Sequence, residues 1–96
     1  MRRDEIIKAL RLFKEGNQQR YRIEKIGIFG SSARGDMNYE SDIDVVVVLE
    51  KQDLFSLIGI KQDLEEKFGL PVDIVSYREK MNNYLKRRVE DEALYA

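Results

Sequence analysis

Residues 30–49 read GSSARGDMNYESDIDVVVVL, and this stretch decides the fold. Its second half, residues 43–49, is rich in β-branched residues and does not alternate between polar and apolar positions, which is typical of a central strand covered on both faces. Its first half, residues 30–41, is rich in glycine, serine, aspartate and asparagine and predicts a loop, with one short helical turn at residues 32–34. The stretch therefore predicts a polar loop that leads directly into a buried strand.

The flanking sequence predicts further helices and strands. In chain order we expect a helix over 4–15, a strand over 23–29, the loop and strand just described, a helix that begins after Asp53 and ends at Gly69, a strand over 72–75, and a helix after residue 83. The 96 residues suffice for one domain, over residues 1–96. We expect an α+β (α/β-like) fold, with a small mixed sheet of about three strands backed by helices on one face.

The amino-acid composition limits the kinds of partner, catalytic group and metal site that the chain can have. The charged fraction is 36%, yet the net charge is −1, so we expect no direct binding of nucleic acid through bulk electrostatics. The chain has no cysteine and no histidine, which leaves carboxylates for any catalysis and a hard cation such as Mg²⁺ or Mn²⁺ for any metal site. It has no apolar run of bilayer length and no signal peptide, so we expect a cytoplasmic protein without a membrane partner.

Three aspartates are the candidate metal ligands. Asp42 and Asp44 lie two residues apart at the entry to the predicted central strand, so both side chains point to one face while Ile43 points into the core. Asp73 lies in the next predicted strand and reaches the same edge if the two strands are neighbours. Such crowded like charges favour a bound cation. An isolated Asp-x-Asp pair is more commonly a solvated or capping feature, and Asp73 could face water on an edge strand.

The loop before these aspartates suits a phosphate. Gly30 directly follows a strand and allows the backbone to pass close to a ligand. Ser31 offers a hydroxyl and a backbone N–H, and Arg34 offers a guanidinium. Taken alone, a Gly-Ser-Ser segment is usually a turn, and Arg34 could equally pair with Asp36 or another surface acid.

The combination resembles the polymerase-β-like nucleotidyltransferase superfamily, whose signature is Gly-Ser, about ten residues, then Asp-x-Asp. Here Gly30-Ser31 is followed by ten residues and then Asp42-Ile43-Asp44. The longer pattern, Gly-Ser-Ser-Ala-Arg-Gly-Asp followed by Ser-Asp-Ile-Asp, is similar to that of the minimal nucleotidyltransferase family. The members of this family are short prokaryotic proteins that serve as antitoxins of HEPN-domain toxins. The resemblance covers nearly the whole chain.

That resemblance implies transfer of AMP from ATP to a hydroxyl, with Mg²⁺ as cofactor. It implies that Asp42, Asp44 and Asp73 hold the metal, that Asp73 also helps to deprotonate the acceptor, and that Gly30 and Ser31 bind the β- and γ-phosphates. Arg34 has a matching position in the family.

The implied acceptor is a tyrosine of a partner HEPN RNase toxin, in a hetero-oligomer. Phe13, Tyr84 and Tyr95 are candidate contacts with that partner, although core packing is the commoner use of such residues. The basic residues 86–88 are expected on a solvated face. Two alternatives stay open: an antitoxin that neutralises by binding alone, and a nucleotidyltransferase that modifies a small molecule such as an aminoglycoside with the help of another subunit.

Overall fold

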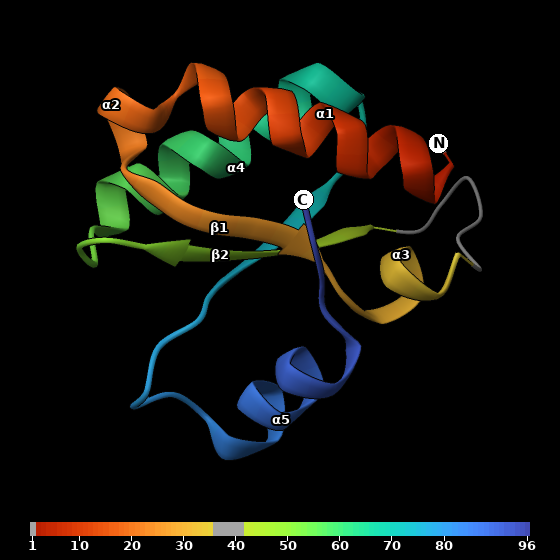
Figure 1. Cartoon of the computed structure of the whole chain (residues 1–96), viewed down its shortest axis with the longest axis vertical. Coiled ribbons are helices and arrows are strands. Elements are labelled where there is room, and N and C mark those ends of the chain that lie inside the picture. The colour runs from red at the N-terminus through yellow and green to blue at the C-terminus, as the bar shows by residue number, and fades with distance from the viewer. Residues whose placement is uncertain (1, 36–41) are drawn as a thin grey trace.

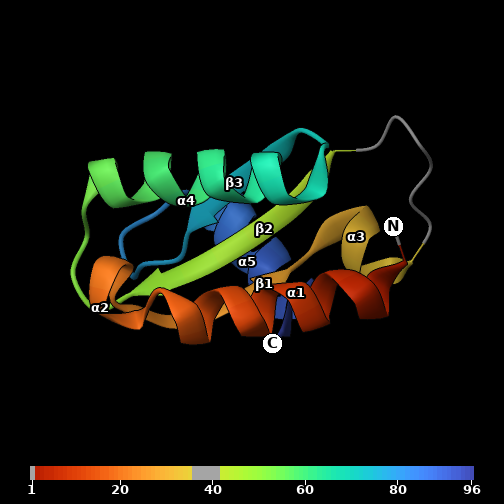
Figure 2. The ribbon, with the colours of Figure 1, turned by 90° about the horizontal axis from the view of Figure 1, so that it is seen from above.

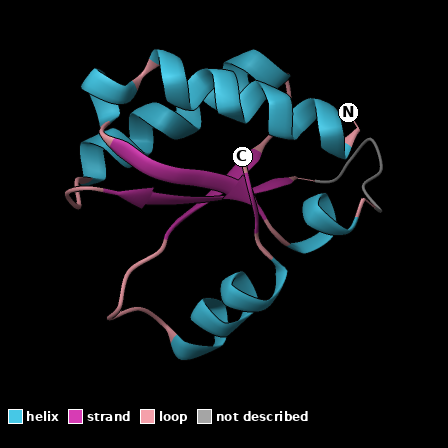
Figure 3. Ribbon diagram, viewed as in Figure 1, coloured by secondary structure: helices cyan, strands magenta, loops and turns pink. Residues whose placement is uncertain are grey.

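A mixed sheet with helices on both of its faces forms the protein (Figure 1). The computed structural model describes residues 2–35 and 42–96. Its elements are α1 (Arg3–Gly16), α2 (Gln18–Tyr21), β1 (Ile23–Ile28), α3 (Gly30–Arg34), β2 (Ile43–Leu49), α4 (Leu54–Phe68), β3 (Val72–Ser76), α5 (Asn83–Glu92) and β4 (Leu94–Tyr95). Figure 3 shows how these helices and strands alternate along the chain.

The strands lie in the order β3-β2-β1-β4. β1 pairs antiparallel with β2 and with β4, whereas β2 and β3 are parallel and joined by α4. The expected α+β fold with a small mixed sheet is confirmed. The sheet has four strands rather than about three because β4, two residues long, pairs with Gly27 and Ile28. A strand of that length leaves no periodic pattern in the sequence.

The expectation that helices back only one face of the sheet is wrong. α1 and α4 cover one face, and α5 lies across the other (Figures 1 and 2). Side chains alternate along β2: Val45 and Val47 belong to the larger core under α1 and α4, whereas Val46 packs with Phe29 and Val89 on the α5 side. Both faces of β2 are buried, which explains why valines follow one another in this strand without alternating polar residues.

Capping residues fix both ends of α4. The Asp53 side chain accepts a hydrogen bond from the backbone N–H of Phe55 at 3.0 Å and caps α4, and Gly69 ends that helix in a left-handed conformation. None of the helices within residues 2–35 and 42–96 has the length and apolarity needed to cross a membrane.

Phe13 packs in the core, which is the commoner of its two expected uses, and is not available to a partner. The ring is buried and stacks on Tyr21 of α2, with the ring centroids 6.1 Å apart. α2 itself was not expected from the sequence; its single turn brings Tyr21 under α1, where the hydroxyl of Tyr21 donates a hydrogen bond to Asp63 at 2.7 Å. Tyr84 and Tyr95 do remain exposed, although Tyr95 lies on β4 rather than on a helix.

Candidate functional site

Parallel pairing of β2 and β3 places two of the candidate acids side by side. Asp44 and Asp73 are direct partners in the strand register. Side chains of paired residues in neighbouring strands point to the same face of a sheet. That face is the α5 side, because Asp44 alternates with the inward-facing Val45 and stands two residues before Val46, which packs against α5.

Asp42 lies just outside β2, two residues before Asp44, and is exposed. The negative charge of Asp42 acts on the carboxyl group of Asp44 and contributes to its raised pKa. Burial raises the pKa of Asp44 above its ordinary value, and the negative charges of Asp73 and, more weakly, Asp42 raise it further. Arg88 on α5 acts in the opposite direction. The three acids therefore share one electrostatic environment at this edge of the sheet.

This environment fits a divalent cation in its chemistry. Oxygen ligands are the ones that Mg²⁺ prefers, and a cation would relieve the repulsion that raises the pKa of Asp44. Within the described part of the chain, however, no three acidic side chains stand in an arrangement that would hold an ion. The strand register places Asp44 beside Asp73, and these two residues with Asp42 are the ones that would hold such an ion.

Gly30 begins α3 immediately beside Asp44. Its φ of +64° is in the left-handed region, and a Cβ at this position would lie 2.6 Å from Oδ2 of Asp44 and 3.2 Å from Nη2 of Arg88. Only glycine fits both the conformation and the space. Gly30 therefore allows the backbone after β1 to pass close to the carboxylate of Asp44.

The two serines after Gly30 have different roles in the structure. Ser32 is fully buried, and its hydroxyl accepts a hydrogen bond from the backbone N–H of Asp44 at 3.1 Å. Ser31 is half-buried. α3 extends from Gly30 to Arg34, so the helical turn begins two residues earlier than the sequence indicated, and the motif residues Asp36 and Ser41 lie outside the described part of the chain.

Two residues of α5 belong to this region and were missed from the sequence. Glu92 accepts from Nη1 of Arg34 at 3.2 Å and lies 3.4 Å from Nε of Arg88, so one carboxylate joins α3 and α5. Arg88 also lies over the ring of Phe29, 5.6 Å from its centroid. The expectation that residues 86–88 form a solvated face is wrong for Arg88, because this half-buried side chain turns toward Asp44 and Gly30. The signal was a helical spacing: residues 85, 88, 89 and 92 share one face of α5.

Lys86 also departs from that expectation. Its side chain is mostly buried and pairs with the carboxylate of Glu79 at 3.2 Å. It therefore serves the packing of the segment that leads into α5.

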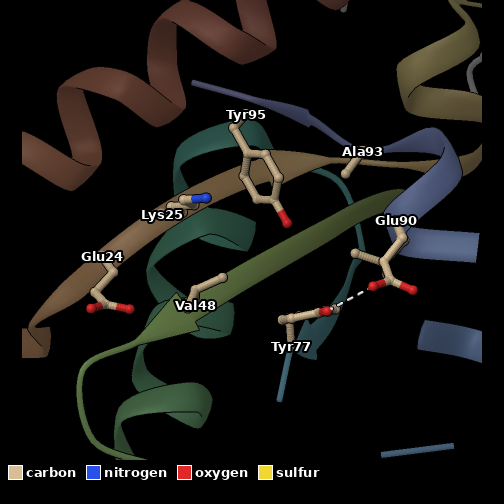
Figure 4. Close-up of a pocket in the computed structure, with 8 residues that line it drawn as sticks. Glu24, Lys25, Val48, Tyr77, Glu90, Ala93 and Tyr95 are labelled. Carbon is tan, nitrogen blue, oxygen red and sulfur yellow. Dashed lines mark hydrogen bonds between the residues drawn. The ribbon is translucent and has the colours of Figure 1, made fainter. Parts of the chain in front are cut away.

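A separate pocket of about 350 Å³ lies on the α5 side of the sheet (Figure 4). It is lined by Glu24, Lys25, Val48, Tyr77, Val89, Glu90, Ala93 and Tyr95. The hydroxyl of Tyr77 donates a hydrogen bond to Glu90 at 3.0 Å across one side of it. Val48 stands four residues beyond Asp44 along β2, so this pocket lies toward the opposite end of the strand from the acids.

The sequence also matches a known protein family, and this match agrees with the arrangement of the acids and the glycine-serine segment. Residues 10–96 match the nucleotidyltransferase domain family. The chain belongs to this family. It is therefore a nucleotidyltransferase, and its identification with the minimal members of the group is confirmed by its relatives. Protein adenylyltransferase MntA of Thermococcus cleftensis is 31% identical over 93 residues, which cover 96% of this chain and 93% of that protein.

Two solved structures extend the comparison of this nucleotidyltransferase. One, assigned as a minimal nucleotidyltransferase, is 32% identical, with a TM-score of 0.77 over 98% of this chain and 95% of the other. The second is a toxin–antitoxin structure with AMP-PNP, in which the matching chain is 25% identical, with a TM-score of 0.73 over 99% of this chain and 72% of the other. The backbone that carries Gly30, Asp44 and Asp73 is thus the nucleotidyltransferase fold.

Proposed function

We propose that this nucleotidyltransferase transfers AMP from ATP to a tyrosine hydroxyl of a partner HEPN RNase toxin and so acts as its antitoxin in the cytoplasm. The observation that carries the proposal is the register of Asp44 with Asp73 directly beside Gly30, which puts an acidic pair next to a glycine-serine loop. The relative from Thermococcus is named a protein adenylyltransferase, and the toxin–antitoxin structure holds an ATP analogue.

The acids and the loop have complementary tasks in this reaction. Asp42, Asp44 and Asp73 would hold Mg²⁺, which would supply electrostatic stabilisation of the charge that develops on the phosphate oxygens. Gly30 and Ser31 bind the β- and γ-phosphates. Arg34 contributes the positive charge of its guanidinium, which Glu92 orients. In the transfer, the acceptor oxygen forms a bond to the α-phosphorus, the bond to the bridging oxygen breaks, and pyrophosphate leaves.

Asp73 is the residue we assign to the acceptor proton. It is exposed on the edge strand β3, whereas Asp44 beside it is partly buried. A hydroxyl that arrives from a partner protein would meet the exposed carboxylate first, and a carboxylate within hydrogen-bond reach can take the proton as the oxygen attacks.

The toxin is expected to contact the chain through exposed aromatic side chains. Tyr84 at the start of α5 is 74% exposed and Tyr95 on β4 is 40% exposed, and α5 also carries Arg88 beside Asp44. A partner bound along α5 would therefore lie close to the acids. Such a position suits delivery of its own hydroxyl to the site.

Labelled ATP and Mg²⁺, incubated with the chain and its toxin, test the proposal. Label should appear on a toxin tyrosine with the wild type and not with Asp42→Ala/Asp44→Ala. Neutralisation of the toxin that survives in this double variant would support an antitoxin that works by binding alone. Label on an aminoglycoside, with none on the toxin, would support the small-molecule reaction instead.

A further inference from the structure

Arg88 occupies a position that none of the assigned roles explains. Its guanidinium is held from three sides: the ring of Phe29 lies under it, Glu92 lies at 3.4 Å from Nε, and Nη2 faces Gly30. Because Glu92 engages Nε, the Nη2 group is the part of the side chain that is directed at the junction between β1 and α3. A long, flexible side chain rarely becomes so constrained on a helix surface without a partner for its charge.

Besides its ion pair with Glu92, the guanidinium of Arg88 lies near the carboxylate of Asp44. The place where a Gly30 Cβ would stand is within 2.6 Å of Oδ2 of Asp44 and within 3.2 Å of Nη2 of Arg88, so both groups flank the same small space. The positive charge of Arg88 offsets part of the repulsion that Asp44 experiences from Asp73. Arg88 thus provides, from the protein itself, the charge that a metal ion would bring.

We propose that Arg88 is a nucleotide-binding residue whose guanidinium, positioned by Glu92, neutralises Asp44 when no cation is bound and binds the β- or γ-phosphate of ATP. This inference rests on the proposed function. A divalent cation held by the acids would itself neutralise Asp44, which would leave the guanidinium of Arg88, beside Gly30, available to phosphate oxygens. A planar guanidinium with several donors is well suited to phosphate oxygens.

The proposal predicts opposite effects on two ligands. Replacement of Arg88 by alanine should weaken the binding of Mg²⁺–ATP by at least about tenfold, because a charge-assisted phosphate contact is lost. The same replacement should tighten the binding of Mn²⁺ added without nucleotide, because the cation no longer competes with Arg88 for Asp44. A merely structural role would weaken both.

Calorimetric titration of the full chain measures both affinities. The first variant is Arg88→Ala. Arg88→Lys keeps the positive charge but loses the planar guanidinium with its several donors. Glu92→Gln removes the negative charge that positions the Arg88 side chain. The matched control is Arg87→Ala, since Arg87 is exposed on the same helix. We expect a graded loss of ATP affinity, largest for Arg88→Ala and smaller for Arg88→Lys and Glu92→Gln, with Arg87→Ala at the wild-type value and the affinity for AMP unchanged throughout.

Three outcomes would overturn the proposal. Wild-type ATP affinity in Arg88→Ala would remove Arg88 from the nucleotide site while leaving the proposed function intact. Loss of both ATP and Mn²⁺ binding in folded Arg88→Ala and Arg88→Lys would assign the residue to structure alone. Failure of the wild type to bind Mg²⁺–ATP would refute the proposed function, and this inference with it.

Discussion

Replacement of Gly30 by alanine should destabilise the protein in two separable ways. The first is conformational, because an alanine at a φ of +64° costs about 1 to 2 kcal/mol. The second is steric: the new Cβ would lie 2.6 Å from Oδ2 of Asp44, which forces that carboxylate out of its preferred rotamer at a cost of about 1 kcal/mol. We therefore expect Gly30→Ala to lower the free energy of unfolding by about 2 to 3 kcal/mol.

Gly69→Ala isolates the first of these effects. Gly69 has a φ of +67°, and a Cβ there would meet nothing within 4 Å, so only the conformational cost applies. Both substitutions restrict the unfolded chain equally, and that contribution cancels in the comparison. The difference between the two variants should be about 1 kcal/mol, or about 4–8 °C in melting temperature for a domain of this size.

Urea unfolding of four variants provides the assay. In the Asp44→Ala background the carboxylate is absent, so the excess cost of Gly30→Ala over Gly69→Ala should disappear, apart from a small adjustment of the flexible Arg88 side chain. Mg²⁺–ATP binding should fall more in Gly30→Ala than in Gly69→Ala. Equal destabilisation by the two alanines, or an excess that persists without the Asp44 carboxylate, would refute the reasoning.

Two further predictions concern the acids in the absence of metal. In EDTA, the contribution of Asp44 to the free energy of unfolding should fall as the pH rises above 3.8, the ordinary pKa of an aspartate, because folded Asp44 retains a proton that the unfolded chain has already released. Unfolding titrations over a pH series should therefore show that the stability of Asp44→Asn increases relative to that of the wild type as the pH rises through this range, and a constant difference between the two would contradict the raised pKa. Asp73→Asn should raise the melting temperature in EDTA, since Asp44 loses a neighbouring charge, and should reduce the further increase that Mg²⁺ produces. Scanning calorimetry with and without Mg²⁺ checks this, and a lower melting temperature in EDTA would show that the two carboxylates do not repel.

The acidic side of the site could be anticipated from the sequence because its information is local. Asp44 opens a strand whose burial is visible in the valine run, and the helix between residues 53 and 69 implies a parallel crossover to the strand that holds Asp73. Two short segments and one rule of strand pairing were sufficient to bring these acids to one edge.

The α5 side could not be anticipated in the same way. Arg88 and Glu92 are more than fifty residues from Gly30 and Ser31 in the chain, and a basic run on a helix is usually solvated. Their place depends on α5 crossing the face of the sheet to which the sequence assigns no particular helix. The buried Val46 requires a covering element on that face, and the helix that holds Val89 one residue after Arg88 provides it.

The hydrogen bond from the Asp44 N–H to the Ser32 hydroxyl divides the site into a stiff part and a yielding part. Ser32 is fully buried there, so α3 and the start of β2 are joined through atoms that are shielded from water. α5 is anchored through Val89, which packs against Phe29 and Val46, but its ion pair with Arg34 is partly exposed and can shift at little cost. A search for altered nucleotide preference should therefore begin with the charged side chains of α5, where substitutions leave Val89 and the start of β2 in place.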